Sequence, residues 1–235
     1  MHRFLAGLSQ EHRLARCYTQ NIDGPEEKVG LCTDLQRGPG DRPREGKASW
    51  IKCQARGNSC WWQNGVECVQ LHGSLFWSRC LKCDGRCGWD EGTQAAMQSG
   101  VMPRCPMCAE ICKSRLEAKK RYYSIGLLRP DIILYGDYHP YSDLITETIQ
   151  HDLSLDIDLL LILGTSLSIP GVKKLVDNLA CVVHEHGGKV IFINLTKPAA
   201  RWDRVFDYWV EWECDSWVKD FQNRTYIRPF SSFRL

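Results

Sequence analysis

The histidine at position 72 is the side chain of this sequence whose type and place best suit proton-transfer chemistry. It follows an apolar run, 66–71, that predicts a buried strand, and Gly73 and Ser74 after it favour a turn. A histidine at a strand end lies at the edge of a sheet, where α/β folds bind ligands. His72 is therefore a candidate base, although by itself it is more typical of an ordinary core histidine.

Two Cys-x-x-Cys pairs follow His72 along the chain. Twenty-one residues separate the pairs, which is close to the spacing of a zinc ribbon, and Pro103 and Pro106 stiffen the second pair. Four thiolates make a closed tetrahedral site for Zn²⁺ that leaves no position for water. We therefore predict one structural zinc, held by Cys80, Cys83, Cys105 and Cys108.

Two further cysteines raise the alternative of a second metal. Cys87 and Cys112 each follow a pair after a three-residue gap, and six cysteines can in principle hold two metals. Binuclear clusters of fungal DNA-binding proteins have a longer third spacing and basic residues between their ligands. The residues here are acidic instead, namely Asp84, Asp90 and Glu91, and this favours a single zinc.

The composition argues against several classes of protein. Thirty basic and 28 acidic side chains leave a net charge of +2, so no bulk field favours nucleic acid or an anionic membrane. The longest apolar run, 159–163, is too short to cross a bilayer, and residues 1–16 lack the apolar block of a secretory signal. An odd count of 13 cysteines indicates thiolates in a reducing compartment. We expect an intracellular, soluble protein.

The amino-terminal elements are expected to present polar groups at a strand end. Residues 2–13 have apolar side chains at helical spacing, and residues 14–18 follow as a candidate strand. Side-chain amides and one carboxylate then cluster in 19–24. Such a cluster can fix a polar ligand by directed hydrogen bonds, but a polar turn ending in Gly24 is the commoner explanation.

Residues 36–65 interrupt this pattern. The stretch 38–46 has the glycine, proline and charge content of a linker, and no periodicity follows it. About thirty residues without structural signals exceed the usual range for a loop, so we predict a mobile insertion. Trp50, Trp61 and Trp62 are unexpected in such a segment.

The carboxyl-terminal half alternates strands and helices. Strands are predicted at 131–135, 158–163, 189–193 and 208–212, and helices at 142–153, 170–187 and 214–222. Nearly continuous apolar strands separated by amphipathic helices indicate an α/β fold, with a parallel sheet covered on both faces.

Four polar pieces fall at predicted strand ends, and parallel topology brings such ends to one edge of a sheet; they are Gln20–Asp23, His72–Gly73, Gly164–Ser166 and Asn194. In chain order, the motifs are Tyr-Thr-Gln-Asn-Ile-Asp-Gly, Leu-His-Gly-Ser, the two Cys-x-x-Cys pairs, Pro-Asp-Ile-Ile-Leu-Tyr-Gly-Asp and Gly-Thr-Ser-Leu. Together they closely resemble the sirtuins, NAD-dependent protein lysine deacylases. Leu-Tyr-Gly-Asp-Tyr-His-Pro and Asp-Tyr-Trp-Val-Glu-Trp-Glu-Cys-Asp are similar to the fungal nuclear branch that acts on histones.

The resemblance covers nearly the whole chain outside the insertion, and it implies a fold. This fold is a Rossmann-like parallel sheet with helices on both faces, plus a small zinc-ribbon module and a cleft between them. The implied divisions are Rossmann-like parts at 1–35 and 127–235, the mobile insertion at 36–65, the strand with the catalytic histidine at 66–75, and the zinc-binding module at 76–126.

The resemblance also implies roles for individual residues. In the family's reaction the acetyl oxygen attacks the NAD ribose carbon as nicotinamide leaves, and His72 matches the general base for a ribose hydroxyl. The residues matching NAD contacts are Gln20, Asn21, Asp23, Gly164, Thr165, Ser166, Asn194 and Cys214 with Asp215. The residues matching the segment that pairs with the acyl-lysine peptide as an added strand are Leu134, Tyr135 and Gly136.

Two features depart from the resemblance. Sirtuins begin with a strand and a Gly-Ala-Gly-Ile-Ser loop that holds the pyrophosphate, followed by an Asp-Phe-Arg turn, and this sequence contains neither motif. Pro25 also replaces the family's usual leucine. We therefore interpret the sequence as amino-terminally truncated, and we expect the chain as given to bind NAD poorly and to turn over slowly or not at all.

Three functional hypotheses follow. The leading one is an NAD-dependent protein deacetylase, a transferase of acetyl groups to the NAD ribose, that acts on histones in chromatin silencing in the nucleus. The rival is a catalytically dead, zinc-containing binding protein with the sirtuin fold. A zinc-dependent nucleic-acid module is disfavoured by the near-neutral charge.

We expect an acetyl-lysine protein as partner, without sequence-specific nucleic acid or membrane binding. The acyl group, the target protein and the oligomeric state are left open by the sequence.

Overall fold

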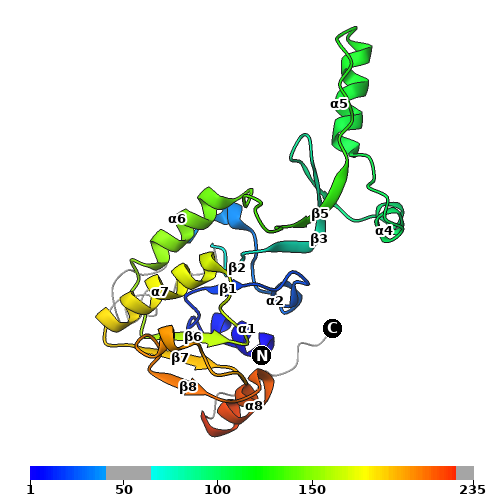
Figure 1. The fold of residues 1–235 in the computed structure, drawn as a ribbon. Coiled ribbons are helices and arrows are strands. Elements are labelled where there is room, and N and C mark those ends of the chain that lie inside the picture. Colours follow the sequence, from blue (N-terminus) through cyan, green and yellow to red (C-terminus); the bar gives the residue numbers. More distant parts are fainter. Residues whose placement is uncertain (41–64, 226–235) are drawn as a thin grey trace, which may run out of the picture. The chain divides into compact units, whose positions relative to one another are not determined.

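The computed structural model describes residues 1–40 and 65–225, which divide into two compact units. The first unit comprises Met1–Cys17, Val29–Cys68 and Asp143–Leu235, and the second comprises Tyr18–Lys28 and Val69–Ser142. Figure 1 labels their helices and strands. The predicted insertion lies outside the described residues over 41–64, so its mobility and the other domain boundaries stay predictions.

A three-stranded parallel sheet forms the centre of the first unit. Its strands are β6 (Leu159–Leu163), β7 (Lys189–Ile193) and β8 (Tyr208–Val210), in the order β6-β7-β8. The strands are almost entirely apolar, as expected where helices cover both faces. The predictions of strands at 158–163, 189–193 and 208–212 are confirmed to within two residues.

Helices lie on both faces of this sheet (Figure 1). On one face lies α7 (Pro170–Glu185), which begins at a proline because the fixed φ of proline suits a first helical turn. On the other, Phe4 of α1 (His2–Gln10) and Leu161 of β6 share an apolar cluster with residues of α8 (Cys214–Thr225). The α/β class with covered faces is therefore confirmed.

Shorter elements complete the connections. The helix predicted at 142–153 is α6 (Ser142–Asp152). The strands predicted at 14–18 and 66–71 are shorter than expected, as β1 (Cys17–Thr19) and β2 (Cys68–Gln70), and they pair with each other. The remaining short elements are α2 (Pro25–Lys28) and the 3₁₀ turns Leu35–Arg37 and Ala200–Trp202.

An antiparallel sheet organises the second unit. Its central strand is β3 (Gly73–Cys80), flanked by β4 (Arg86–Gly88) and β5 (Leu128–Ile132). Two helices, α4 (Glu91–Gln98) and α5 (Pro106–Glu117), lie between β4 and β5 in the sequence.

The turn predicted at Gly73 and Ser74 was placed two residues too late. The turn falls at Leu71 and His72, and Gly73 already pairs with Ile132 as the first residue of β3. The early reversal follows from Gly73, whose φ of +79° lets the chain turn into the new strand at once. As a result, His72 lies in the turn itself.

The strand predicted at 131–135 was placed three residues too late and in the wrong sheet. It is β5, which ends at Ile132 and runs antiparallel to β3. Because β5 is an edge strand, it tolerates Pro130, which cannot donate a ladder hydrogen bond. Residues 134–136 are therefore not part of a strand.

Buried charges hold the antiparallel sheet together. The carboxylate of Asp131 on β5 accepts from Nε of Arg79 at 2.7 Å and from Nε of Arg86 at 2.9 Å. Burial opposes the charge on Arg79, but the hydrogen bonds and charge interactions with Asp131 and Tyr141 together outweigh burial, so the pKa of Arg79 is raised. Arg79 also donates to the carbonyl oxygen of Asp84 at 3.0 Å. The pairs thus join β3, β4 and β5.

The first unit contains a second buried ion pair. Arg16 donates to both carboxylate oxygens of Asp152, from Nε at 2.9 Å and from a terminal nitrogen at 2.8 Å. Each side chain is only 1% exposed. Arg16 also donates to the carbonyl oxygen of Pro39 at 2.9 Å. Arg16 therefore connects the segment before β1 with α6 and with the segment around Pro39.

We predict that Arg16→Met destabilises the first unit strongly. The change leaves the Asp152 carboxylate without its guanidinium partner, which costs about 3–5 kcal/mol in a buried pair. Chemical denaturation followed by circular dichroism measures this loss. The double variant Arg16→Met/Asp152→Leu is expected to recover much of it, because both charges are then gone. Equal stability of Arg16→Met and the unchanged chain would contradict a structural role for the pair.

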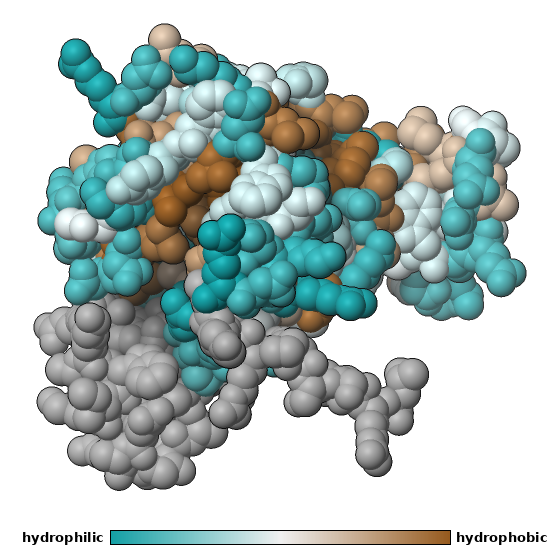
Figure 2. Space-filling view, turned by 90° about the horizontal axis from the view of Figure 1, so that it is seen from below, coloured by the Kyte–Doolittle hydropathy of each residue, from teal (hydrophilic) through white to brown (hydrophobic). Residues whose placement is uncertain are grey.

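The surface carries both polar and apolar side chains. On the face drawn in Figure 2, hydrophobic residues form brown patches bordered by hydrophilic ones. Across residues 1–40 and 65–225, no helix has the length and apolarity that crossing a membrane requires.

Candidate functional site

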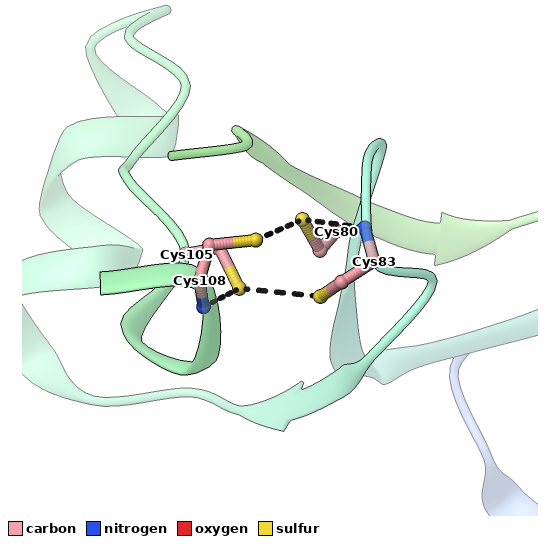
Figure 3. Close-up of side chains that lie close together, drawn as sticks. All are labelled: Cys80, Cys83, Cys105 and Cys108. Atoms are coloured by element: carbon pink, nitrogen blue, oxygen red, sulfur yellow. Dashed lines mark hydrogen bonds between the residues drawn. The ribbon is translucent and has the colours of Figure 1, made fainter. Parts of the chain in front are cut away.

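Four cysteine side chains of the second unit converge on one point (Figure 3). Sγ of Cys80 lies 3.7 Å from Sγ of Cys108, and Sγ of Cys83 lies 3.8 Å from Sγ of Cys105. Four sulfur atoms around zinc, each with a Zn–S bond of about 2.3 Å, form a tetrahedron with edges of about 3.8 Å. The spacing of these thiols therefore fits the predicted structural zinc.

The surroundings of the thiols also suit a bound cation. Burial disfavours the Cys80 thiolate, but the backbone N–H groups of Cys83 and Lys82 and the thiols of Cys83 and Cys105 together outweigh it and lower the pKa of Cys80 to about 7. Burial and the neighbouring thiols raise the pKa of Cys105 to about 12. Four thiolates in this buried place would repel one another, and a bound divalent cation offsets this repulsion.

The two additional cysteines stand outside this group. Only the four predicted ligands belong to the set whose sulfur atoms all lie within 4.8 Å of one another. Cys87 packs against the cluster from β4, and Cys112 is buried on α5. One zinc fits this arrangement better than two.

His72 lies half-buried in the turn between β2 and β3. Its Nδ1 is 3.2 Å from the carbonyl oxygen of Gln20. A carbonyl can only accept, so Nδ1 carries the proton and Nε2 keeps a lone pair. The backbone N–H of Ile133 donates to the carbonyl of His72 at 2.9 Å, and that of Leu71 donates to Thr19 at 3.0 Å. The turn therefore holds His72 in the tautomer that can accept a proton at Nε2.

The glycine after His72 is required by a close approach of two strands. A Cβ atom at Gly73 would lie 2.2 Å from the carbonyl oxygen of Asp131 on β5. No side chain fits at that distance, and the positive φ of Gly73 adds strain for any other residue. The His-Gly pair of the motif thus has a structural reason in this chain.

Glu26 organises the polar loop that follows β1. Its buried carboxylate accepts a hydrogen bond from Oγ1 of Thr19 at 2.6 Å and one from Nδ2 of Asn21 at 3.3 Å. The predicted NAD residues Asn21 and Asp23 are exposed on this loop, and Gln20 is half-buried beside His72. The hydrogen bonds of the Glu26 carboxylate therefore fix the conformation of the loop, while the side chains of Asn21 and Asp23 stay exposed.

Pro25 fits its position despite its departure from the sirtuin pattern. It is the first residue of α2, where its fixed φ and missing N–H cost nothing. Gly24 before it has a φ of +58° and approaches the ring of Phe76 closely. The loop after Asp23 therefore accommodates the proline.

The predicted peptide-binding residues Leu134, Tyr135 and Gly136 form an exposed loop after β5. Tyr135 is 94% exposed. The carboxylate of Asp137 accepts from Arg129 at 2.7 Å and from the N–H of Leu134 at 3.4 Å, which closes the loop on itself. The segment is open to an added chain.

Three predicted NAD residues meet at strand ends in the first unit. Gly164 follows β6 with a φ of +60°, and a Cβ atom there would lie 3.4 Å from Sγ of Cys214. The thiol of Cys214 donates to the carbonyl of Ile193 at 3.7 Å. Asn194 follows β7 and donates from Nδ2 to the carbonyl of Thr196 at 3.2 Å. The carboxyl ends of β6 and β7 and the start of α8 thus come together.

Thr165 and Ser166 continue the turn after β6. Oγ1 of Thr165 accepts from the N–H of Leu167 at 3.1 Å, and Oγ of Ser166 donates to Oγ of Ser168 at 3.2 Å. Burial and adjacent carboxylates raise the pKa of Cys214, which keeps its thiol neutral. The edge therefore presents hydroxyl and amide groups without a fixed charge at Cys214.

The predicted residues thus gather in two sets, one in each unit. The second unit brings His72 against Gln20, and the first brings Gly164 and Asn194 to the start of α8. Two polar residues that support the set around His72 were not predicted from the sequence, the buried Glu26 and the half-buried His139. Nothing but their nearness to a polar strand end or the Tyr-Gly motif marks them in the sequence.

Comparisons with known proteins agree with this arrangement. The Sir2 family model matches residues 61–170. The NAD-dependent histone deacetylase HST3 of Candida albicans is 38% identical over 93% of this chain and 42% of its own length. The protein of the same name from Saccharomyces cerevisiae is 37% identical over 92% of this chain and 46% of its own length. The chain therefore spans less than half the length of these curated relatives.

Solved structures show the same fold at low sequence identity. A structure of Sir2Tm bound to a propionylated peptide has a TM-score of 0.63 and 18% identity, and the match covers 97% of this chain and 70% of that one. A complex described as Sir2-p53 peptide-NAD+ has a TM-score of 0.62, with the same identity and coverage. At this identity the likeness establishes the fold.

Proposed function

The chain belongs to the Sir2 family, and on this premise we propose that it is an NAD-dependent protein deacetylase of acetyl-lysine side chains. The observation that carries the proposal is the hydrogen bonding of His72. Its Nδ1–H is committed to the Gln20 carbonyl, and its Nε2 is left as a base beside the polar loop at 20–23. The proposal extends to acetylated histones as substrates, because the relatives from both yeasts are named histone deacetylases.

The strand-end residues of the first unit fit a dinucleotide. Gly164 offers bare backbone at a positive φ, and Ser166 and Asn194 offer hydroxyl and amide groups at the same edge. We assign these residues, with Thr165 and Cys214, to the adenosine side of NAD. Gln20, Asn21 and Asp23 are assigned to the nicotinamide side, where exposed amide and carboxylate groups can orient a ribose.

Bound NAD supplies the ribose carbon that takes up the acetyl oxygen as nicotinamide departs. His72 accepts a proton from a ribose hydroxyl at Nε2, while the Gln20 carbonyl stabilises the imidazolium through Nδ1–H. The exposed segment Leu134–Gly136 binds the peptide backbone as an added strand. The zinc of the four cysteines is structural, because four protein ligands leave no place for substrate.

Partners and location follow from the same premise. A deacetylase of histones has its substrate in chromatin, so we propose a nuclear protein that takes part in silencing. The near-neutral charge gives no reason to propose sequence-specific nucleic-acid binding.

The test is the removal of acetyl groups from an acetyl-lysine histone peptide by the purified, zinc-loaded chain. Deacetylated peptide and free nicotinamide are expected to form slowly, because the sequence lacks the Gly-Ala-Gly-Ile-Ser motif, but in equal amounts and only when NAD and the acetylated peptide are both present. The unacetylated peptide is the matched control. Zinc-loaded, folded protein that binds the peptide but releases no nicotinamide would overturn the proposal and favour a binding protein instead.

A further inference from the structure

His139 is the one residue of the segment 134–140 that is not exposed to solvent. Its neighbours Tyr135 and Tyr138 are 94% and 95% exposed, whereas the imidazole of His139 turns inward. Sequence reasoning assigned no role to it. An inward histidine in an otherwise exposed loop needs contacts that compensate for its burial.

Both ring nitrogens of His139 have a partner. The backbone N–H of Tyr141 donates to Nδ1 at 3.1 Å, and Nε2 lies 3.3 Å from the carbonyl oxygen of Gln70. An N–H can only donate and a carbonyl can only accept, so Nδ1 is unprotonated and Nε2 carries the hydrogen. This is the opposite tautomer from that of His72.

The surroundings keep His139 neutral. Burial lowers its pKa, and the positive charge of Arg79 and the nearby His72 act in the same direction. The Gln70 carbonyl and the Asp131 carboxylate oppose this shift but do not cancel it. A proton on Nδ1 would also face the N–H of Tyr141, so the contact geometry itself favours the neutral ring.

The contact to Gln70 reaches the turn that carries His72. Gln70 is the last residue of β2, two positions before His72, and it is buried. The other ties of this turn run from Leu71 to Thr19, from His72 to Gln20 and from Ile133 to His72. The hydrogen bond from His139 adds a further tie, at the Gln70 carbonyl where β2 ends.

The anchor of His139 is itself rigid. The ring of Tyr141, whose N–H binds His139, lies 5.0 Å from the guanidinium of Arg79. Arg79 forms the buried pair with Asp131 and donates to the carbonyl of Asp84, directly after the Cys80–Cys83 turn. His139 therefore connects the charged centre of the antiparallel sheet to the turn at 71–72.

We propose that His139 is a positioning residue for His72: its Nε2–H holds the Gln70 carbonyl, and thereby fixes the turn that aims Nε2 of His72. This role deepens the proposed deacetylase function and rests on it. It predicts that a side chain keeping the donor at Nε2 preserves turnover, whereas one lacking the donor does not.

The test compares three variants of the full chain. Gln places an N–H donor where Nε2 lies, so His139→Gln is expected to keep kcat within about threefold of the unchanged chain. Asn is polar but too short to reach Gln70, and Leu has no donor, so His139→Asn and His139→Leu are expected to lower kcat about tenfold or more. A misplacement of about 1 Å at a catalytic group is enough for such a loss. KM for NAD and peptide should change less than twofold.

Two readouts separate positioning from a loss of folding. The loss of kcat should persist well below the melting midpoint, and imidazole ¹⁵N shifts of His139 in the unchanged chain should report the neutral Nε2–H tautomer at pH 7. Unchanged kcat in His139→Leu, or a mixture of tautomers at His139, would overturn the positioning role alone. An unchanged chain without turnover would overturn the proposed function, and the positioning role with it.

Discussion

Replacing His72 by alanine is expected to lower the rate of peptide deacetylation by about 10²–10⁴-fold, the usual contribution of a positioned general base. The imidazole donates from Nδ1 to the Gln20 carbonyl, which leaves Nε2 as the proton acceptor. Alanine has no group that can take a proton at this place. Mass spectrometry of the peptide product measures the effect directly.

A second substitution separates the base from the structure. His72→Asn keeps a donor near Gln20, so it should preserve the turn, but its amide cannot act as a base. Both variants should therefore be equally inactive, with His72→Asn the more stable in thermal unfolding. The matched control is His186→Ala, a histidine exposed at the end of α7, which should leave activity unchanged. Turnover by His72→Asn near that of the unchanged chain would contradict the assignment.

The sequence was sufficient for the parallel sheet because helices cover its strands on both faces. A strand of that kind must be apolar throughout, and β7 was accordingly predicted at 189–193, the bounds that the structure has. The start of α7 at Pro170 was predictable for a similar local reason, since proline fits a first helical turn.

The antiparallel sheet was harder to predict because several of its buried residues are polar. On β3, Ser74, Ser78 and Arg79 are buried, whereas Leu75 and Phe76 are exposed. This pattern is the reverse of an amphipathic strand, so hydrophobic alternation gives no signal. Asp131 compensates for the burial of Arg79. The two residues are 52 positions apart in the sequence, so neither segment alone identifies the pair.

In the candidate site, residues that follow a known spacing or strand pattern were predictable, and residues defined only by their contacts were not. The zinc ligands were predictable because metal geometry imposes a spacing on the chain, and their sulfur atoms converge as expected. His72 was identified because it follows a predicted strand. Glu26 and His139 were not, because no sequence pattern marks their contacts; His139, for example, contacts Gln70, which is 69 residues away.

Removing one thiolate from the metal site is expected to have the largest effect on the fold of the second unit. In Cys105→Ser, the hydroxyl replaces a thiolate that zinc requires, and zinc content should fall from one per chain to nearly none. The cluster at this place contains few apolar residues besides the cysteines, so no hydrophobic core compensates for the loss. Because apparent zinc affinities of such sites correspond to about 10–16 kcal/mol, the module should unfold.

Elemental analysis and limited proteolysis test this prediction against a matched control. Cys112→Ser makes the same change seven residues later in the chain, at a buried cysteine on α5 outside the ligand group, and should keep one zinc and resist protease. Loss of zinc should also reduce deacetylation, since Arg79 donates to the carbonyl of Asp84 after the Cys80–Cys83 turn and lies against Tyr141, which anchors His139. Two zinc ions in the unchanged chain, or full zinc in Cys105→Ser, would refute the four-cysteine site.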